Sequence, residues 1–210
     1  MYKRNQVQEA MIAVLKPASR RHSSEMIGRV KRLLDTDRAR GRNKRASDPE
    51  KTNFAFHSDA MPGRGHENRF SEFDVFALLM ALRLMGLGLP QGIVVGLLRR
   101  LRPQLEQQYA QILRQSAADL FDEQQAQRKA KPGDLVFVTT DPRFIVITSE
   151  GDRRESRSVT ICRGQREVFE LIHRYGPGYT FTLLDLVPSA SALSSALAES
   201  EPRTRGRARE

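Results

Sequence analysis

The residue types that most often serve at catalytic and metal centres are few in this sequence and widely spaced. It has four histidines and a single cysteine, and none of them stands at a metal-ligand spacing from another. The cysteine, Cys162, lies in an apolar run typical of a strand, which favours a small core residue over a nucleophile. The sequence contains neither a phosphate-cradling loop ending in Lys-Ser/Thr nor a Gly-x-Ser-x-Gly motif. We therefore predict no metal, no cofactor and no enzymatic activity.

One group of acidic residues could support a different chemistry, the metal-dependent hydrolysis of nucleic acid. Its members are spread through the C-terminal half: Asp134, Asp141, Glu150 and Asp152. All four are predicted at strand ends or turns, where acidic residues are common because their side chains bond the local backbone. A nuclease is therefore a third hypothesis, behind the two binding functions described below.

Basic residues dominate the chemistry of the N-terminal third. The chain has 35 lysines and arginines against 25 acidic residues, which gives a net charge of +10. Residues 1–70 hold 16 basic and 8 acidic residues, whereas residues 119–188 hold 10 and 11. An excess of cations confined to one end predicts a polyanionic partner. Because neutralised phosphates release condensed counterions, a few lysines and arginines give nucleic-acid binding that is strong and salt-sensitive.

The leading hypothesis is a contact with double-stranded DNA, made by basic side chains of the N-terminal half. The sequence alone does not separate DNA from RNA. The candidate contact residues are, in chain order, Arg20, Arg21, Arg29, Lys31, Arg32, Arg38, Arg40, Arg42, Lys44, Arg45, Arg64, His66 and Arg69.

Two short helices are expected to position the first of these cations. The spacing of apolar residues predicts a helix over 6–15, which the Lys16-Pro17 pair should end because a residue before proline is pushed out of the helical region. A second helix is predicted over 25–38, and its basic residues lie off its apolar stripe. Two helices joined by a short polar connection, the second with a basic outer face, are the pattern of a helix-turn-helix, whose second helix enters the major groove.

The region that follows is predicted as a basic arm and a hairpin. Residues 40–52 carry no large apolar residue and should be mobile in the free protein; they could order on a phosphate backbone or form a plain solvated loop. Residues 53–70 are predicted as a hairpin, with strands at Phe54–His57 and Glu67–Phe70 and a Pro-Gly turn between them. In a winged helix such a hairpin is the wing, and its tip touches phosphate or the minor groove.

The middle of the chain is predicted to be helical and strongly apolar. Ser71 and Asp74 form a capping-box-like start to a helix over 71–86. This helix is apolar nearly all round, so it must be buried, either in the domain core or against a second copy of the chain. The 104–117 segment has an apolar stripe that could pack internally or form an antiparallel contact. We therefore predict a homodimer through 71–86, through 104–117, or through both.

Three arginines follow in the helix between these segments, which opens at Pro90. Arg99, Arg100 and Arg102 are expected on a solvated face, as most charge runs on helices are. Pro103 is expected to kink this helix or to restart it, because proline removes a backbone donor.

Two short motifs frame the apolar helix: Arg-Phe-Ser-Glu-Phe-Asp-Val over 69–75, and Leu-Arg-Leu-Met-Gly-Leu-Gly-Leu over 82–89. Together with Leu78 they make residues 69–101 similar to part of the mercury-resistance-regulator (MerR-like) winged-helix family. In that family the first motif leaves the wing and opens a long helix, and the second turns into the next helix. The resemblance implies a dimeric, DNA-binding transcriptional regulator with a separate C-terminal effector or accessory region, and it makes Arg69 a candidate wing contact.

The last third of the chain changes from helical to strand-like periodicity and is predicted as a small α+β module. Polar residues over 122–131 lead to Pro132-Gly133, which marks a boundary. The predicted elements are strands at 135–139, 144–148, 159–162 and 179–187 and a helix over 165–175.

The fold class predicted from these patterns is α+β. A mostly helical winged helix-turn-helix domain is expected over 1–118, a small α+β module over 119–188, and a mostly disordered tail over 189–210. No apolar run reaches the roughly 18 residues that span a bilayer, and a lone cysteine suits a reducing compartment, so we predict a cytoplasmic protein without membrane contact. The alternative to a transcriptional regulator is a non-enzymatic adaptor, in which the basic half is only a charged scaffold and the α+β module binds another protein.

Overall fold

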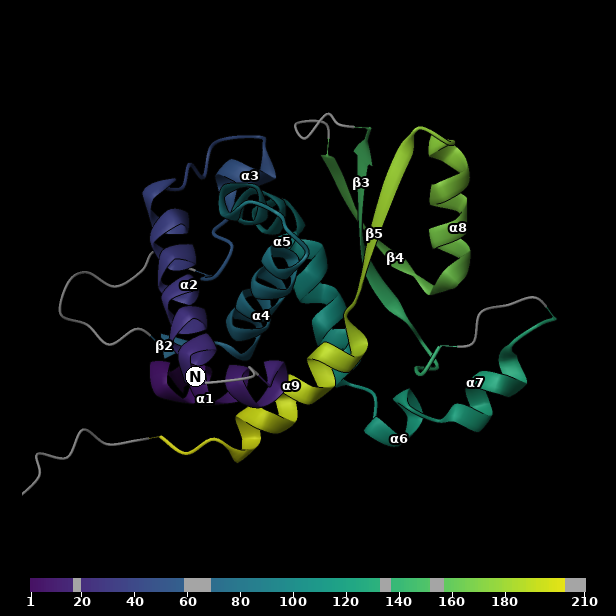
Figure 1. Ribbon diagram of the computed structural model, residues 1–210, viewed down its shortest axis with the longest axis horizontal. Coiled ribbons are helices and arrows are strands. Elements are labelled where there is room, and N and C mark those ends of the chain that lie inside the picture. Colours follow the sequence, from purple (N-terminus) through teal and green to yellow (C-terminus); the bar gives the residue numbers. More distant parts are fainter. Residues whose placement is uncertain (17–19, 59–68, 133–136, 152–156, 203–210) are drawn as a thin grey trace, which may run out of the picture. The chain divides into compact units, whose positions relative to one another are not determined.

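The fold is α+β, built largely of helices with two small antiparallel sheets (Figure 1). Among the residues with described positions, no helix is both long and apolar enough to cross a bilayer. The computed structural model describes residues 1–16, 20–58, 69–132, 137–151 and 157–202.

The chain forms two compact units. Unit 1 combines Met1–Arg102 with Ala192–Glu210, and unit 2 is Pro103–Ser191. The division falls inside two helices, α5 (Gln91–Leu113) and α9 (Val187–Glu199). Unit 1 therefore draws on both ends of the chain, and it contains every candidate DNA-contact residue.

Unit 1 begins with a short ribbon and a helix. Strand β1 (Tyr2–Lys3) pairs antiparallel with β2 (Arg69–Phe70), which fastens the N-terminus beside the start of the central helix. Helix α1 (Arg4–Leu15) ends where the sequence predicts. Lys16, the residue before a proline, leaves the helical region and takes a φ of 45°.

The helix predicted over 71–86 is present as α4 (Glu72–Gly86), the centre of unit 1. Its capping box is present as predicted. The Asp74 N–H donates to the Ser71 hydroxyl at 3.1 Å, and the Ser71 N–H donates to the Asp74 carboxylate at 2.9 Å. Eleven of its 15 residues are buried, and α2 (Arg20–Ala39) packs along it (Figure 1). The apolar surface of α4 is thus covered within one chain.

The helix that follows is longer than predicted. Helix α5 runs through Pro103 without a break and ends at Leu113. The first ten residues of the predicted 104–117 segment therefore form the last part of α5. The short helix α6 (Ala117–Leu120) begins where that segment stops.

The tail predicted as mostly disordered contains a helix, α9, which corrects that prediction. Leu193 and Leu197 of α9 are buried. The end of the helix meets the N-terminus, where the Gln6 side-chain amide donates to the Ser200 oxygen at 3.0 Å. Alanine and serine separate the few apolar residues of this helix, and that dilute stripe gave no periodicity strong enough to predict it.

Unit 2 is built on a three-stranded antiparallel sheet in the order β4–β3–β5, and α8 lies along one of its faces (Figure 1). The three strands and the helix confirm the predictions for this region. Their bounds are Arg143–Glu150 for β3, Arg157–Arg163 for β4, Gly164–Tyr175 for α8 and Tyr179–Asp185 for β5.

The core between this sheet and α8 contains the only cysteine. Cys162 is buried with Phe144 and Val146 of the sheet and with Val168 and Leu171 of α8. Burial raises the pKa of the Cys162 thiol, with a smaller contribution from a nearby carboxylate, so the thiolate is disfavoured. The prediction that Cys162 is a core residue is confirmed.

The strand predicted at Phe54–His57 is wrong, and side chains are the reason. The Asp37 carboxylate accepts the backbone N–H groups of Ala55 and Phe56, and the Arg102 guanidinium donates to the Ala55 oxygen at 3.0 Å. These bonds satisfy the backbone in place of a strand partner. Because β2 pairs instead with β1, the predicted hairpin wing does not form from these two segments. The predicted tip of the hairpin lies outside the described residues.

One further prediction for unit 2 needs correction, and a second segment contains a helix that was not predicted. Residues 137–139 are not a strand, and the rest of the predicted 135–139 strand lies outside the described residues. The adjoining Thr140 N–H bonds the Leu120 oxygen at the end of α6, which anchors this stretch to a helix end. The polar boundary predicted before Pro132 contains a helix, α7 (Glu123–Lys129), capped by the Asp122 side chain.

Candidate nucleic-acid interface

One side of α2 is fixed to the rest of unit 1. Met26, Val30 and Leu33 are buried on this side, where α2 packs against α4. The Gln91 side chain at the start of α5 donates to the Thr36 hydroxyl at 2.5 Å. These contacts fix the rotation of α2, so the residues on its other side are presented to solvent in a defined order.

The exposed side of α2 presents two rows of basic residues. Arg29 and Arg32 are three positions apart and form the first row, and Lys31 and Arg38, seven apart, form the second. At 100° per residue the rows lie about 140° apart around the helix axis. All four side chains are exposed. Arg29, Lys31 and Arg32 have no carboxylate partner among the described residues, so their charge is available to a ligand.

Small residues lie between the two rows in the first half of α2. Gly28 stands there without a side chain, and the surface is hollowed over about 450 Å³. The second half of α2 carries the exposed Asp35 on this side. Between the two rows the first half of α2 is therefore more open to a polyanion than the second half, and Glu25 contributes one carboxylate to the edge of the hollow. The hollow is lined by Ser24, Glu25, Gly28, Arg29 and Arg32.

Residues 40–52, predicted to be mobile, are held by bonds to the rest of unit 1. The Arg40 guanidinium pairs with Glu50 at 2.7 Å and donates to a backbone oxygen of α5 at 2.8 Å. Arg42 donates to a backbone oxygen of α3 (Pro49–Thr52) at 2.9 Å. The prediction was wrong because the absence of apolar residues hid the polar contacts that order the segment.

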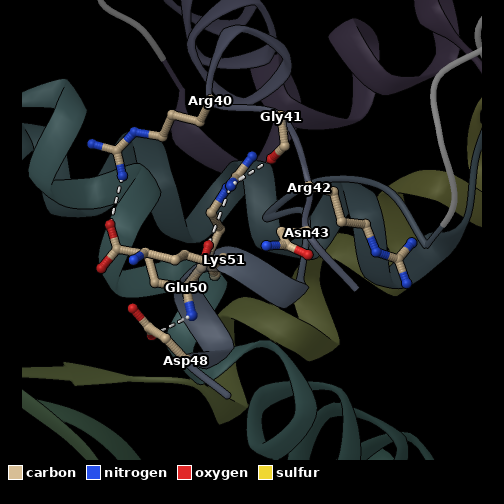
Figure 2. Close-up of a pocket in the computed structure, with 8 residues that line it drawn as sticks. Arg40, Gly41, Arg42, Asn43, Asp48, Glu50 and Lys51 are labelled. Carbon is tan, nitrogen blue, oxygen red and sulfur yellow. Dashed lines mark hydrogen bonds and ion pairs between the residues drawn. The ribbon is translucent and has the colours of Figure 1, made fainter. Parts of the chain in front are cut away.

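The folded 40–52 segment encloses an open hollow of about 760 Å³. Figure 2 shows the Arg40–Glu50 ion pair on one side of it and Arg42 on the other, with Asn43 between them. The Arg42 guanidinium is turned away from Asn43. The full lining is Arg40, Gly41, Arg42, Asn43, Asp48, Glu50, Lys51 and Arg99.

A buried arginine lines this hollow and holds the backbone around it. Arg99 of α5 is 2% exposed and pairs with the fully buried Asp37 at 2.6 Å. Its guanidinium also donates to the backbone oxygens of Gly41 at 2.9 Å and Glu50 at 3.2 Å. One side chain therefore ties the end of α2 and the start of α3 to α5.

A second buried arginine holds the segment after α3. Arg102, 5% exposed, pairs with Asp74 of α4 at 2.9 Å and donates to the Ser58 hydroxyl at 3.1 Å. The predicted solvated face of α5 is therefore wrong for Arg99 and Arg102. Of the three arginines, Arg100 alone is exposed, and it pairs with Glu50 at 3.3 Å.

A buried histidine lies beside this network. His57 is 6% exposed and stacks on Phe70 with ring centroids 5.3 Å apart. Its Nε2 has no hydrogen-bond partner among the described residues. Burial lowers the pKa of His57; Asp74 and Asp37 oppose the shift, and Arg102 adds to it. Burial of His57 therefore favours its neutral form in the folded protein.

The structure places the other sequence-predicted contacts as follows. Lys44 and Arg45 are exposed on the loop before α3, and Arg69 is exposed on β2. Arg20 and Arg21 belong to the first turn of α2. Arg64 and His66 lie outside the described residues. The structure thus brings Arg29 and Arg32 together at one hollow, and Arg40 and Arg42 at another.

Of the four cations that line the larger hollow, Lys51 and Arg99 were missed from the sequence, and so was the polar residue Asn43. Lys51 lies in the basic 40–52 run and lines the hollow, yet was not among the candidates. Its place in the same basic run was a signal that could have found it.

The acidic residues weighed for metal-dependent hydrolysis are not assembled in the described part of unit 2. Asp141 is bonded to Arg143 and to the Gln115 amide. Burial alone would raise the pKa of Asp141, but its bond to Arg143 holds the pKa below the usual range. Asp134 and Asp152 lie outside the described residues. Within the described part of the chain, no group of three or more histidine, cysteine or acidic side chains could hold a metal ion.

Comparison with known proteins adds no family to this description, since no family model matches the chain and no curated protein is significantly similar to it.

Proposed function

We propose that unit 1 binds double-stranded DNA through the exposed side of α2, and that the protein acts by binding and not by catalysis. The observation that carries this proposal is the pair of basic rows on α2. Arg29 and Arg32 form one row, Lys31 and Arg38 the other, and Gly28 lies between them. The opposite side of the same helix is packed on α4, so the rows face outward.

The spacing of the rows suits a duplex. A helix in the major groove has a phosphate strand on each side of it, and basic residues on both flanks can meet both strands. Small residues between the rows let the helix axis approach the base edges. The exposed Asp35 lies between the rows in the second half of α2 and is repelled by phosphate, whereas the exposed Glu25 of the first half lies beside Arg29 and Arg32 at the hollow. The first half, where Gly28 lies between the rows, is therefore the part that we expect to enter the groove.

The resemblance of residues 69–101 to MerR-like proteins supports DNA over RNA as the partner. It also favours a transcriptional regulator, which is the role we propose. The paired rows do not require a wing, which matters because Phe54–His57 does not supply one. The expected homodimer stays a prediction, and α4 offers it no uncovered apolar surface.

Replacement of Arg29, Lys31 and Arg32 by alanine tests the proposal. We expect the affinity for a labelled duplex of mixed sequence to fall about tenfold or more, because three phosphate contacts are lost. The slope of log affinity against log salt should fall by about 2 to 3 for the same reason. Fluorescence anisotropy titrations at several salt concentrations measure both quantities.

A matched control separates a local contact from overall charge. Arg128, Arg166 and Arg174 are exposed residues of unit 2, and their replacement by alanine removes the same net charge. This variant should bind the duplex nearly as well as the unmodified protein. Equal losses in both variants would show that the binding is not located on α2.

A further inference from the structure

The hollow enclosed by residues 40–52 carries more positive than negative charge. Four cations and two carboxylates line it. Behind the lining, Asp37 neutralises Arg99, and Arg100 shares Glu50 with Arg40. Five cations thus meet three carboxylates, which leaves an excess of two positive charges around an open space.

Two donors of the lining are not used by the protein. The Lys51 ammonium has neither an ion pair nor a hydrogen bond among the described residues. The Asn43 side-chain oxygen accepts from the Arg45 N–H at 3.1 Å, which fixes that amide and leaves its NH₂ group without an acceptor in the part of the chain that the structure describes. A ligand oxygen can therefore be bonded by an ammonium and an amide donor without breaking an existing contact.

The backbone around these donors is already folded. The Asn43 N–H donates to the Lys51 oxygen at 2.8 Å, so the two residues stand on bonded neighbouring segments. Asp48 caps α3, and Arg42 is held by backbone oxygens that leave its charge uncompensated. Little ordering is needed on binding, which favours affinity.

We propose that this hollow binds a phosphate group, with Lys51 and Asn43 as the contacting residues and Arg40 and Arg42 as the source of the surrounding positive field. A charged acceptor with several oxygens suits an ammonium and an amide donor in a cationic hollow. The volume of about 760 Å³ exceeds that of a lone phosphate and is within the range of small-molecule pockets. The phosphate could belong to a phosphorylated small molecule or to the backbone of a nucleic acid. The first source goes beyond the proposed function, and the second rests on it.

A titration of the full chain with inorganic phosphate tests the site. Two-dimensional NMR spectra monitor binding through the amide signals of residues 40–52. We expect saturable shifts that sodium chloride of equal ionic strength does not produce. Lys51→Gln should weaken binding about three- to tenfold, because one charge-assisted bond is lost. Asn43→Asp keeps the oxygen that accepts from Arg45 but replaces the donor by a negative charge, so we expect a loss of about tenfold or more.

Lys44→Gln is the matched control, since Lys44 is an exposed lysine of the same loop that does not line the hollow. All three substitutions change the net charge by one unit in the same direction. Only Lys51→Gln and Asn43→Asp should weaken phosphate binding. Shifts that do not saturate, or an equal loss in Lys44→Gln, overturn the proposal. Unchanged signal dispersion in each variant shows that the fold is retained.

A second arm adds a DNA duplex to the phosphate-saturated protein and identifies the source of the phosphate. Displacement of the phosphate signals assigns the hollow to the nucleic-acid backbone, and simultaneous binding of both assigns it to a phosphorylated small molecule. If the protein binds phosphate saturably but does not bind duplex DNA, the proposed function is contradicted and the phosphate site is supported.

Discussion

Helices α2 and α5 of unit 1 both carry clustered arginines, and the structure uses them in opposite ways. On α2, Arg29 and Arg32 point away from the core and have no carboxylate partner among the described residues. On α5, Arg99 and Arg102 are almost fully buried and each pairs with an aspartate. The difference teaches that the side of the helix on which a cation stands, and not the number of cations, decides whether it organises the fold or meets a partner.

The largest expected effect comes from the buried pair on α5. Arg102→Ala leaves the Asp74 carboxylate in the core without its partner. We expect the free energy of unfolding to fall by about 3–5 kcal/mol, because an uncompensated buried charge remains. Urea denaturation measures this loss. Arg100→Ala on the same helix, whose ion pair is exposed, should change stability by less than about 1 kcal/mol. Similar losses of unfolding free energy in the two variants would contradict the different roles given to the buried and the exposed arginine.

A smaller effect is expected from His57, which lies beside the same network. Burial lowers its pKa, so below about pH 6.5 the unfolded chain takes up a proton before the folded protein does. Stability should therefore fall as pH drops below about 6.5, with a contribution from this residue of at most about 1.4 kcal/mol per pH unit. Urea melts of the unmodified protein and of His57→Leu between pH 8 and about pH 5 measure the difference. A variant with the same pH dependence as the unmodified protein would contradict a neutral, buried His57.

The smallest effect on stability is expected where the effect on binding is greatest. Replacement of Arg29, Lys31 and Arg32 by alanine should change the free energy of unfolding by no more than about 0.5 kcal/mol, since these exposed side chains make no ion pair among the described residues. Alanine also favours a helix. Thermal denaturation of the variant beside the duplex titration checks this. A marked loss of stability would mean that these cations serve the fold, as those of α5 do.

The burial of the α5 arginines could have been predicted from their positions relative to the apolar residues of the helix. Arg102 stands four residues after Leu98 and three before Leu105, so it falls on the apolar stripe of its helix. Asp74, its partner, stands four residues before Leu78 in α4, which is apolar nearly all round. A charged residue on an apolar stripe needs a buried partner of opposite charge, and two such stripes in one domain predict the pair.

Regular elements with strong periodicity were predictable, and segments held by side chains were not. Helix α4 and the strands of unit 2 follow from their apolar patterns alone. The 40–58 stretch takes its shape from Asp37 and from two arginines, Arg99 and Arg102, that lie far beyond it in the sequence, so no local pattern could reveal it. The candidate hollow was unpredictable for the same reason, although two of the four cations that line it, Arg40 and Arg42, were predicted contact residues.

The assembly of unit 1 from both ends of the chain has a consequence for its biosynthesis. A ribosome that has released the first 102 residues has not yet made α9, whose end is bonded to Gln6 of α1. The N-terminal helices must therefore wait until α9 has been made before this neighbour arrives. Any fragment cut at the α5 junction would also lack that closing segment, and with it one anchor of its own first helix.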